Sequence, residues 1–382
     1  MDTPGAGPLD GLLVADFSRV LAGPFATMML ADLGARVVKV ERPAVGDDSR
    51  GYGPFAADGR SLYFARVNRG KESVALDLKD DADLGVARAL VARADVVVEN
   101  YRPGVMERLG LGPTALLAAH PALVYCSISG FGHTGPWSQR PAYDAVVQGM
   151  SGLLAITGEP DGPPVKPGAP VADLSAGLYA FGAITTALLG RARTGRGTHL
   201  DLAMFDATVS LLEGAALSYL STGVEPPRIG NAHQSIAPFD TFSCADGDIT
   251  VCAANDLLFG ALVTALGLPA LLGDGRFASN ALRHEHRGPL KAALEGALRT
   301  GGTQHWLGVL EAAGVPCGPI SSVTEAVGSA QTAARRMVVE AGGLPVPGNP
   351  VKASGYPDPL VRPPAPALDE HGAAVRAEFG WG

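Results

Sequence analysis

Cysteine, charge of one sign and long apolar runs are all scarce in this chain of 382 residues. The 4 cysteines form no CxxC pair, which excludes a disulfide framework and a cysteine-based zinc site. Thirty Lys+Arg against 38 Asp+Glu give a net charge of −8 with no basic block, so we expect no nucleic-acid partner. The N-terminus has no secretory signal pattern, and so few cysteines fit a reducing compartment. We therefore expect a cytoplasmic protein.

The longest apolar stretch, residues 174–190, is 17 residues long and is interrupted by Ser175, Thr185 and Thr186. A helix that spans a bilayer needs about 20 apolar residues, so we interpret this stretch as a buried helix and expect no membrane partner. Gly and Pro number 50 and 30, about a fifth of the chain and below the range typical of low-complexity disorder. The composition indicates a globular, loop-rich protein.

Two hydrophobic periodicities alternate over the first part of the chain, which is typical of βαβ units and a parallel sheet. The pattern predicts strands at 12–17, 36–41, 73–78, 95–100, 123–129 and 199–205, and helices at 24–33, 81–92, 143–154 and after Asp173. We therefore predict an α/β fold for residues 1–221, the large domain.

The pattern changes beyond residue 221, where 222–238 is rich in Gly, Pro and Asn. Asp246-Gly247 between β-like runs predicts a hairpin of 240–244 and 249–253. Helical patterns follow at 256–266, 287–298, 303–313 and 323–327, so residues 222–335 are predicted to be a linker and a smaller α+β domain. The rest, 336–382, is mostly Pro/Gly-rich with a helix at 369–379, and we expect it to return to the large domain or to cover a partner.

Familiar cofactor motifs are missing. The chain contains no GxGxxG fingerprint, no Walker motif and no zincin pair, which removes the main support for a nicotinamide or flavin enzyme and predicts no metal site. Ligands of open α/β sheets bind at the carboxyl ends of the strands, here the loops at 17–24, 41–43, 99–104 and 129–132. Four arginines on or beside these loops are either phosphate-binding forks or solvated surface residues: Arg42, Arg102, Arg108 and Arg140.

Asp173 lies between the extended segment 170–172 and the apolar helix, so its spacing predicts an N-cap position. A structural cap accepts the first free N–H groups of the helix. The same position would also hold an ionised carboxylate at the rim of the sheet, where it could attack an acyl carbonyl. Periodicity does not choose between the two roles.

Several histidines and one cysteine are further candidates. His133 and His233 are general bases or ordinary loop histidines, whereas His284 and His286 are two residues apart in a helical stretch and are read as surface residues. Cys317 lies in an apolar turn without a nearby cation, which favours a buried, inert thiol over a nucleophile.

A series of short motifs runs in one order along nearly the whole chain. They are DFSRVLAGPF at 16–25, ADLGA at 31–35, VKVER at 38–42, NRGK at 68–71, LDL at 76–78, VENYRPG at 98–104, SGFG at 129–132, AD at 172–173, TGRG at 194–197 and GVPCGP at 314–319. Together they resemble the class III coenzyme A transferases, the formyl-CoA and carnitine CoA-transferase family, which also contains the 2-methylacyl-CoA racemases.

The resemblance implies a Rossmann-like large domain built from both ends of the chain, a small domain, and two subunits interlocked as rings. It also implies that Asp173 attacks an acyl-CoA thioester to form a mixed anhydride, that the CoA thiolate then forms an aspartyl-CoA thioester, and that an acceptor carboxylate reverses the sequence. Coenzyme A would thus be a substrate and no cofactor would be bound permanently.

The resemblance also assigns residues to the CoA site. They are Val20, Leu21 and Ala22 in the first loop, Arg42 at the nucleotide phosphates, Leu76 at the adenine, Asn100, Tyr101 and Arg108 along the groove, and Arg140 and Tyr143 in a 140–144 loop that closes over the pantetheine. The loop at 230–233 is assigned to a flap near the acyl group.

Two departures from the family patterns bear on the activity. Racemases of the family carry a basic histidine where this chain has Tyr143, and formyl-CoA transferases carry a glutamine where it has Leu21. These departures disfavour α-proton exchange and oxalate/formate exchange. The resemblance therefore predicts a homodimeric CoA-transferase that moves CoA from an acyl-CoA, with succinyl-CoA as the expected donor, to a free carboxylic acid. The alternatives are a 2-methylacyl-CoA racemase that uses Asp173 in proton transfer and a non-catalytic protein that binds acyl-CoA.

Overall fold

The computed structural model describes residues 7–380, which divide into two compact units. The first unit contains the chain up to Leu154, then Lys166–Val224, and the chain from Ala330 onward; the second contains Ala155–Val165 and Glu225–Ser329. The sequence predicted changes of domain after residues 221 and 335, a few residues from those observed. It assigned 155–165 to the large domain, whereas this segment packs with the second unit.

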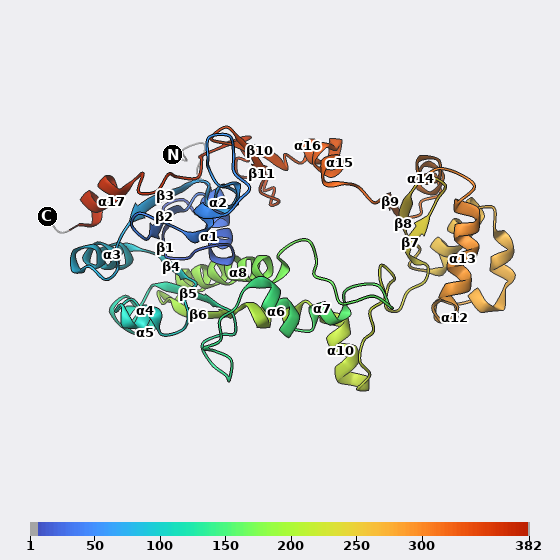
Figure 1. Cartoon of the computed structure of the whole chain (residues 1–382), viewed down its shortest axis with the longest axis horizontal. Helices are drawn as coiled ribbons and strands as arrows, with labels where there is room; N and C mark the ends of the chain where they lie inside the picture. The colour runs from blue at the N-terminus through green and yellow to red at the C-terminus, as the bar shows by residue number, and fades with distance from the viewer. Residues whose placement is uncertain (1–6, 381–382) are drawn as a thin grey trace. The chain divides into compact units, whose positions relative to one another are not determined.

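A sheet of six parallel strands forms the centre of the first unit, in the order β3-β2-β1-β4-β5-β6 (Figure 1). The strands are β1 (Leu13–Asp16), β2 (Arg36–Glu41), β3 (Lys71–Ala75), β4 (Val96–Glu99), β5 (Val124–Ser129) and β6 (Thr198–Ala203). The order reverses between β1 and β4, and such a reversal opens a crevice at the carboxyl ends of the strands. The predicted α/β fold with a parallel sheet is confirmed.

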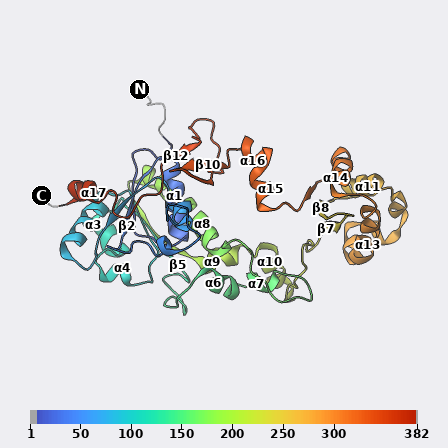
Figure 2. The same cartoon turned by 45° about the horizontal axis from the view of Figure 1, so that its top comes forward.

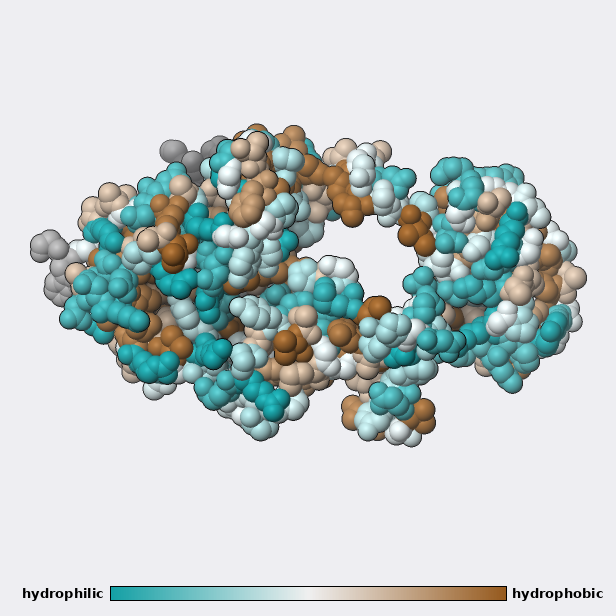
Figure 3. All heavy atoms as spheres, viewed as in Figure 1, coloured by the Kyte–Doolittle hydropathy of each residue, from teal (hydrophilic) through white to brown (hydrophobic). Residues whose placement is uncertain are grey.

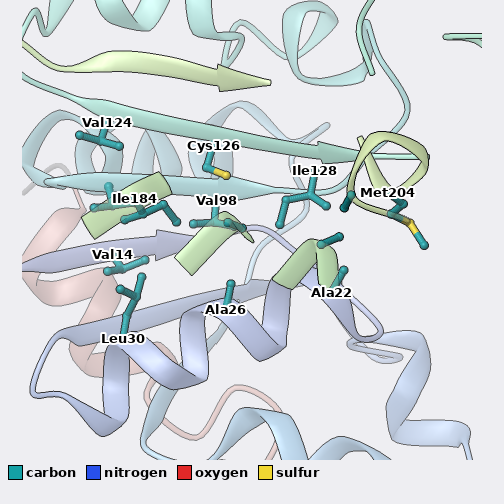
Figure 4. Close-up of a cluster of buried hydrophobic side chains, with 14 of the residues drawn as sticks. Val14, Ala22, Ala26, Leu30, Val98, Val124, Cys126, Ile128, Ile184 and Met204 are labelled. Atoms are coloured by element: carbon teal, nitrogen blue, oxygen red, sulfur yellow. The ribbon is translucent and has the colours of Figure 1, made fainter. Parts of the chain in front are cut away.

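Four helices cover one face of this sheet: α1 (Ala22–Asp32), α6 (Asp144–Met150), α8 (Val171–Thr194) and α9 (Met204–Ser210). Figure 4 shows Val14, Val98 and Val124 of the strands packed with Ala26 and Leu30 of α1 and with Ile184 of α8. Helices α1 and α8 approach closely at Gly177, where an added Cβ would lie 2.8 Å from the carbonyl oxygen of Ala22. Small residues therefore set the position of α8, and with it the position of Asp173.

The opposite face is covered by α3 (Asp81–Arg93), α4 (Val105–Arg108), α5 (Pro113–Ala119) and α17 (Gly372–Phe379). Helix α17 lies beside α3 in both Figure 1 and Figure 2. The two helices are joined by an ion pair of 2.6 Å between Arg376 Nη1 and Asp83 Oδ1. The C-terminal end of the chain thus closes the core of the first unit.

The remaining elements of the first unit are short, which is why the sequence did not reveal most of them. They are the 3-10 turn η1 (Asp48–Gly51), α2 (Leu62–Asn68), α10 (Glu213–Thr222), α16 (Ala330–Ala334), and a small sheet of β10 (Val338–Ala341), β11 (Leu344–Pro347) and β12 (Val361–Arg362). Helix α7 (Leu153–Ile156) lies at the change between units.

The second unit packs helices on a three-stranded antiparallel sheet of β7 (Phe239–Ser243), β8 (Asp248–Cys252) and β9 (Cys317–Pro319). Its helices are α11 (Asp256–Ala265), α12 (Asn280–Glu285), α13 (Arg287–Leu298), α14 (Thr303–Ala312) and α15 (Val323–Gly328), with 3-10 turns η2 (Pro269–Gly273) and η3 (Gly275–Phe277). The predicted hairpin is present, each strand displaced by one residue. Phe242, Leu262 and Leu294 belong to a separate core.

Candidate active site

A pocket in the first unit opens at the carboxyl ends of the strands, where the loops after β1, β4 and β5 meet the start of α8. It is lined by most of the residues that the sequence proposed, namely Val20, Leu21, Ala22, Asn100, Tyr101, Arg140, Tyr143 and Asp173. Arg102 lines the same pocket. Segments more than 150 residues apart in the chain therefore meet around one carboxyl group.

Asp173 is the third residue of α8, and the N-cap of this helix is Pro170. The prediction that Asp173 is the N-cap is therefore wrong. Proline suits the position before the first helical turn because its nitrogen carries no proton to leave unpaired. The carboxyl that accepts from the start of α8 belongs to Asp144: its Oδ1 lies 3.0 Å from the Ala172 nitrogen and 3.4 Å from the Asp173 nitrogen. The side chain of Asp173 is left free for chemistry.

The electrostatic environment of Asp173 disfavours its charged form. Burial, followed by the negative charge of Asp144, raises the pKa of Asp173 to about 7, and the positive charge of Arg66 opposes this shift. A carboxylate that is stabilised so little by its surroundings is a better nucleophile than an ordinary aspartate. Asp173 therefore stays protonated to a higher pH than an ordinary aspartate.

The loop after β1 is held in a strained conformation. Val20 has a φ of +67°, which is unusual for a β-branched residue and costs on the order of 1–3 kcal/mol. Its N–H donates to Asp47 Oδ1 at 3.1 Å. The neighbouring Arg19 is held from both sides by Asn100, whose Oδ1 accepts from the Arg19 N–H at 2.8 Å and whose Nδ2 donates to the Arg19 carbonyl at 2.7 Å. The amide of Asn100 thus fixes this loop.

Two buried ion pairs lie beneath the loop. Lys39 Nζ is 2.9 Å from Asp47 Oδ2 and donates to the Ser18 carbonyl at 2.7 Å, and Lys71 Nζ is 2.9 Å from Asp16 Oδ2. Burial alone would lower the pKa of Lys39, but Asp47 and the nearby carboxylates hold it above its usual range. The sequence analysis missed these pairs. The signal was a lysine inside the apolar strand β2, since a buried charge requires a partner.

Three predicted CoA residues do not line the pocket. Arg42 is more than half exposed and pairs with Asp48, its Nη2 lying 2.6 Å from Asp48 Oδ1. Arg108 is an exposed residue of α4. Leu76 is 1% exposed and packs in the core under α3, so its side chain offers no surface to an adenine ring. A contact between Leu76 and adenine would have to come from its backbone.

The histidine candidates lie elsewhere. His133 donates its backbone N–H to Asp201 at 3.0 Å, and its ring packs edge-on against that of His199. In the second unit, His233 Nδ1 accepts from the N–H groups of Ser235 and Ile236, both at 3.1 Å, which is a turn-stabilising role. His284 and His286 are half-buried, not surface residues.

The cysteine candidate also lacks the features of a nucleophile. Cys317 is half-buried in the second unit, and burial raises the pKa of its thiol. Among residues 7–380, no group of three or more His, Cys, Asp and Glu side chains is arranged to hold a metal ion.

Helix α2 contributes two side chains near Asp173 that the sequence analysis did not single out. The Arg66 guanidinium stacks on the Tyr63 ring, with Cζ 3.9 Å from the ring centroid, and Tyr63 packs edge-on against Tyr52 at 5.5 Å. Burial raises the pKa of Tyr63, Arg66 lowers it, and Asp173 raises it further, so the three groups lie within electrostatic range of one another. A helix of only seven residues carries no periodic pattern that would have pointed to them.

Comparison with known proteins agrees with this arrangement. The family model described as "CoA-transferase family III" matches residues 9–372. The chain is 51% identical to an acetyl-CoA:oxalate CoA-transferase of Acetobacter aceti, in a match that covers 98% of this chain and 96% of the relative. It is 41% identical to a succinyl-CoA:glutarate CoA-transferase of Mus musculus, in a match that covers 97% of this chain and 86% of the relative. A crystal structure of a CAIB/BAIF family protein from Brucella suis matches with a TM-score of 0.87 and 44% identity, covering 98% of this chain and all of that one.

Proposed function

Because this chain belongs to CoA-transferase family III and is a CoA-transferase, we propose that it moves coenzyme A from succinyl-CoA or a similar acyl-CoA to a free carboxylic acid. The observation that carries this proposal is the Asp173 carboxyl, which lies in the wall of the pocket with its pKa raised to about 7, mainly by burial. The absence of a cofactor motif agrees with a reaction that uses only this carboxyl and its substrates. We also propose a cytoplasmic location, on the basis of the few cysteines.

The proposed reaction proceeds by exchange at Asp173. Its carboxylate attacks the thioester carbonyl and expels the CoA thiolate, which leaves a mixed anhydride. The thiolate then attacks the Asp173 carbonyl, releases the donor acid and forms an aspartyl-CoA thioester. The acceptor carboxylate attacks this thioester and expels the CoA thiolate, which leaves a second mixed anhydride between Asp173 and the acceptor. The thiolate finally attacks the acceptor carbonyl of this anhydride to give the new acyl-CoA and the free aspartate. No water takes part, so the thioester energy is retained.

We place CoA along the loops at the carboxyl ends of the strands. The strand order is that of doubly wound nucleotide-binding sheets, which supports the Rossmann-like assignment. Val20, Leu21 and Ala22 would contact the pantetheine beside Asn100 and Tyr101, with Arg140 and Tyr143 closing the other side. Arg42 and Arg108 are exposed and available to phosphates of a nucleotide that extends beyond the pocket.

The proposal includes a homodimer with interlocked subunits. Helix α8 is long and apolar enough to cross a bilayer by length and composition alone, yet one side of it packs against α1. Its other side exposes Leu178 and Tyr179, and helix α10 buries none of its residues, with Leu217 and Leu220 exposed by 66% and 79%. In Figure 3 hydrophobic atoms lie at the margins of α10, beside hydrophilic ones. Apolar surface of this kind is typical of a subunit interface.

We expect the chain to sediment as a dimer, and Leu217→Asp with Leu220→Asp to shift it toward the monomer, because two charges in an apolar interface are not compensated. Analytical ultracentrifugation at several concentrations measures the shift. Leu257→Asp on α11, a leucine that is 83% exposed, is the control and should leave the dimer intact. A monomeric wild-type chain would contradict the proposed assembly.

The raised pKa of Asp173, due first to burial, leads to a prediction about pH. The nucleophile is the ionised form, so the rate of the first half-reaction should rise with pH through a midpoint near 7. In Asp144→Asn the amide oxygen still accepts from α8, but the charge that raises the pKa of Asp173 is gone, so the midpoint should move toward acid. Single-turnover rates between pH 5.5 and 8.5 measure it. A midpoint that stays in place would show that Asp144 does not act on Asp173.

The activity is tested by incubating the enzyme with succinyl-CoA and a panel of acids, and following new acyl-CoA species by mass spectrometry. The panel includes oxalate: Leu21 argued against it, but the 51% identical relative is named for it. The racemase alternative predicts deuterium at the α-carbon of a 2-methylacyl-CoA in heavy water without any acid. Nothing in the structure favours it, since Tyr143 is 68% exposed and carries a phenol where the racemases carry a histidine. Deuterium exchange without transfer would overturn the proposal.

A further inference from the structure

Gln148 is a polar side chain inside the first unit, on helix α6. It is 0% exposed, although glutamine is mostly found at protein surfaces. Its Nε2 donates to Asp144 Oδ2 at 2.7 Å, one turn earlier in the same helix. Its Oε1 is buried and has no hydrogen-bond partner among the described residues. A buried acceptor without a donor costs free energy, so the arrangement calls for an explanation.

The orientation of the Gln148 amide follows from its neighbour. A carboxylate offers only acceptors, so the opposite orientation would set Gln148 Oε1 against Asp144 Oδ2 with no proton between the two oxygens. The unpartnered Oε1 is thus a consequence of placing a donor on Asp144. An apolar side chain at position 148 would avoid the unpartnered acceptor, but it would also leave Asp144 Oδ2 without this donor.

The Asp144 carboxylate connects two helices. Asp144 is the first residue of α6, yet its Oδ1 accepts from the start of α8, at 3.0 Å from the Ala172 nitrogen and 3.4 Å from the Asp173 nitrogen. Its Oδ2 accepts from Gln148. Because both oxygens are engaged, the carboxylate cannot rotate without breaking a hydrogen bond. Gln148 therefore fixes the group that holds the first turn of α8, where Asp173 lies.

We infer that Gln148 is a positioning residue for the transfer reaction and acts on Asp173 through Asp144. This inference rests on the proposed transferase function. Asp173 lines the pocket, whereas Asp144 and Gln148 are not among the residues that line it, so we expect neither of them to contact the substrate. A displacement of a reacting group by about 1 Å can slow its reaction about 100-fold. Loss of the Gln148 donor should therefore affect the rate of attack and not the binding of acyl-CoA.

Gln148→Met tests this inference, because methionine is unbranched like glutamine and donates no hydrogen bond. Labelling of Asp173 by succinyl-CoA, trapped with hydroxylamine, gives the rate at saturation and the concentration at half-saturation. We expect the saturating rate to fall about 10- to 100-fold and the half-saturating concentration to change less than about twofold. The melting temperature should change little, because the variant also removes the unpartnered acceptor. Gln304→Met, which removes an exposed glutamine on α14, is the matched control.

The same substitution in the background of Asp144→Asn shows whether Gln148 acts through Asp144. The new amide turns its N–H groups toward position 148, since its oxygen is taken by α8, so a donor from Gln148 is no longer needed there. Gln148→Met should then lower the saturating rate less than about threefold. An equal loss in both backgrounds would overturn the inference, because Gln148 would then serve packing alone.

Two further results would also count against the inference. They are an unchanged saturating rate in Gln148→Met, and a loss that falls on the half-saturating concentration instead. Either result would leave the transferase function intact, since Asp173 would still be labelled. If succinyl-CoA does not label the wild type, the proposed function fails, and the inference with it.

Discussion

Asp173→Ala is expected to abolish CoA transfer, with a loss of at least about 10⁴-fold, because no other carboxyl group is among the residues that line the pocket. Alanine is preferred to asparagine for the main test, since a buried asparagine in this site could be hydrolysed back to aspartate. Asp173→Asn serves as the isosteric second variant. Both should be assayed for new acyl-CoA and, separately, for binding of CoA.

Replacing Asp173 should not lower the free energy of unfolding. Because its pKa is raised above the unfolded value, mainly by burial, Asp173 destabilises the native state increasingly as the pH rises from about 4 to about 7, and fully above that. Asp173→Asn should therefore raise the melting temperature, and more at pH 8 than at pH 5. Asp206→Asn on α9, an exposed aspartate, is the control and should keep full activity. Appreciable turnover in Asp173→Ala would show that the nucleophile lies elsewhere.

Of the substitutions proposed, Lys39→Met should lower the free energy of unfolding most, by about 3–5 kcal/mol, because it leaves the buried carboxylate of Asp47 without its partner. Both side chains of the pair are essentially inaccessible, at 0% and 1% exposure. Asp47 also holds the strained Val20, so transfer activity should fall together with stability. Urea unfolding monitored by circular dichroism measures the free energy.

Two comparisons separate a buried ion pair from a general packing defect. Burial would raise the pKa of Asp47, but the charge of Lys39 and the hydrogen bonds from Lys39 and Ser49 together lower it to about 2. The cost of Lys39→Met should therefore shrink at pH 4, where the unpaired Asp47 takes up a proton. The double variant with Asp47→Asn should recover much of the loss. Arg42→Met, which breaks the exposed pair with Asp48, should cost no more than about 1 kcal/mol. Equal losses for Lys39→Met and Arg42→Met would contradict the account.

Much of the sheet of the first unit could be predicted because strands such as β1, β2, β4 and β5 are buried along most of their length and appear as apolar runs, although β6 is mostly not buried. Strands β2 and β4 are examples, with Arg36–Glu41 and Val96–Glu99 close to the predicted ranges. Helix α2 and the strands of the C-terminal sheet are two to seven residues long, too short for a period to be recognised. The segment Ala155–Val165 was misplaced because long-range packing, not local pattern, assigns it to the second unit.

Part of the candidate site could also be predicted from the sequence. The residues on loops after β1, β4 and β5 follow from the rule that ligands bind at the carboxyl ends of strands, and they line one pocket with Asp173. What the sequence could not show is which side chains act on one another across space. Asp144 caps α8 from 29 residues away. The positive charge of Arg66, which lies in a short helix without a sequence motif, lowers the pKa of Asp173.

Trapping of the covalent intermediate tests the central claim most directly. The enzyme is mixed with succinyl-CoA, quenched with hydroxylamine, digested and mapped by mass spectrometry, with Asp173→Ala treated in parallel. The account predicts a hydroxamate at Asp173 in the wild type and no modified peptide in the variant. A modification at another residue, or unmodified protein that still transfers CoA, would contradict it.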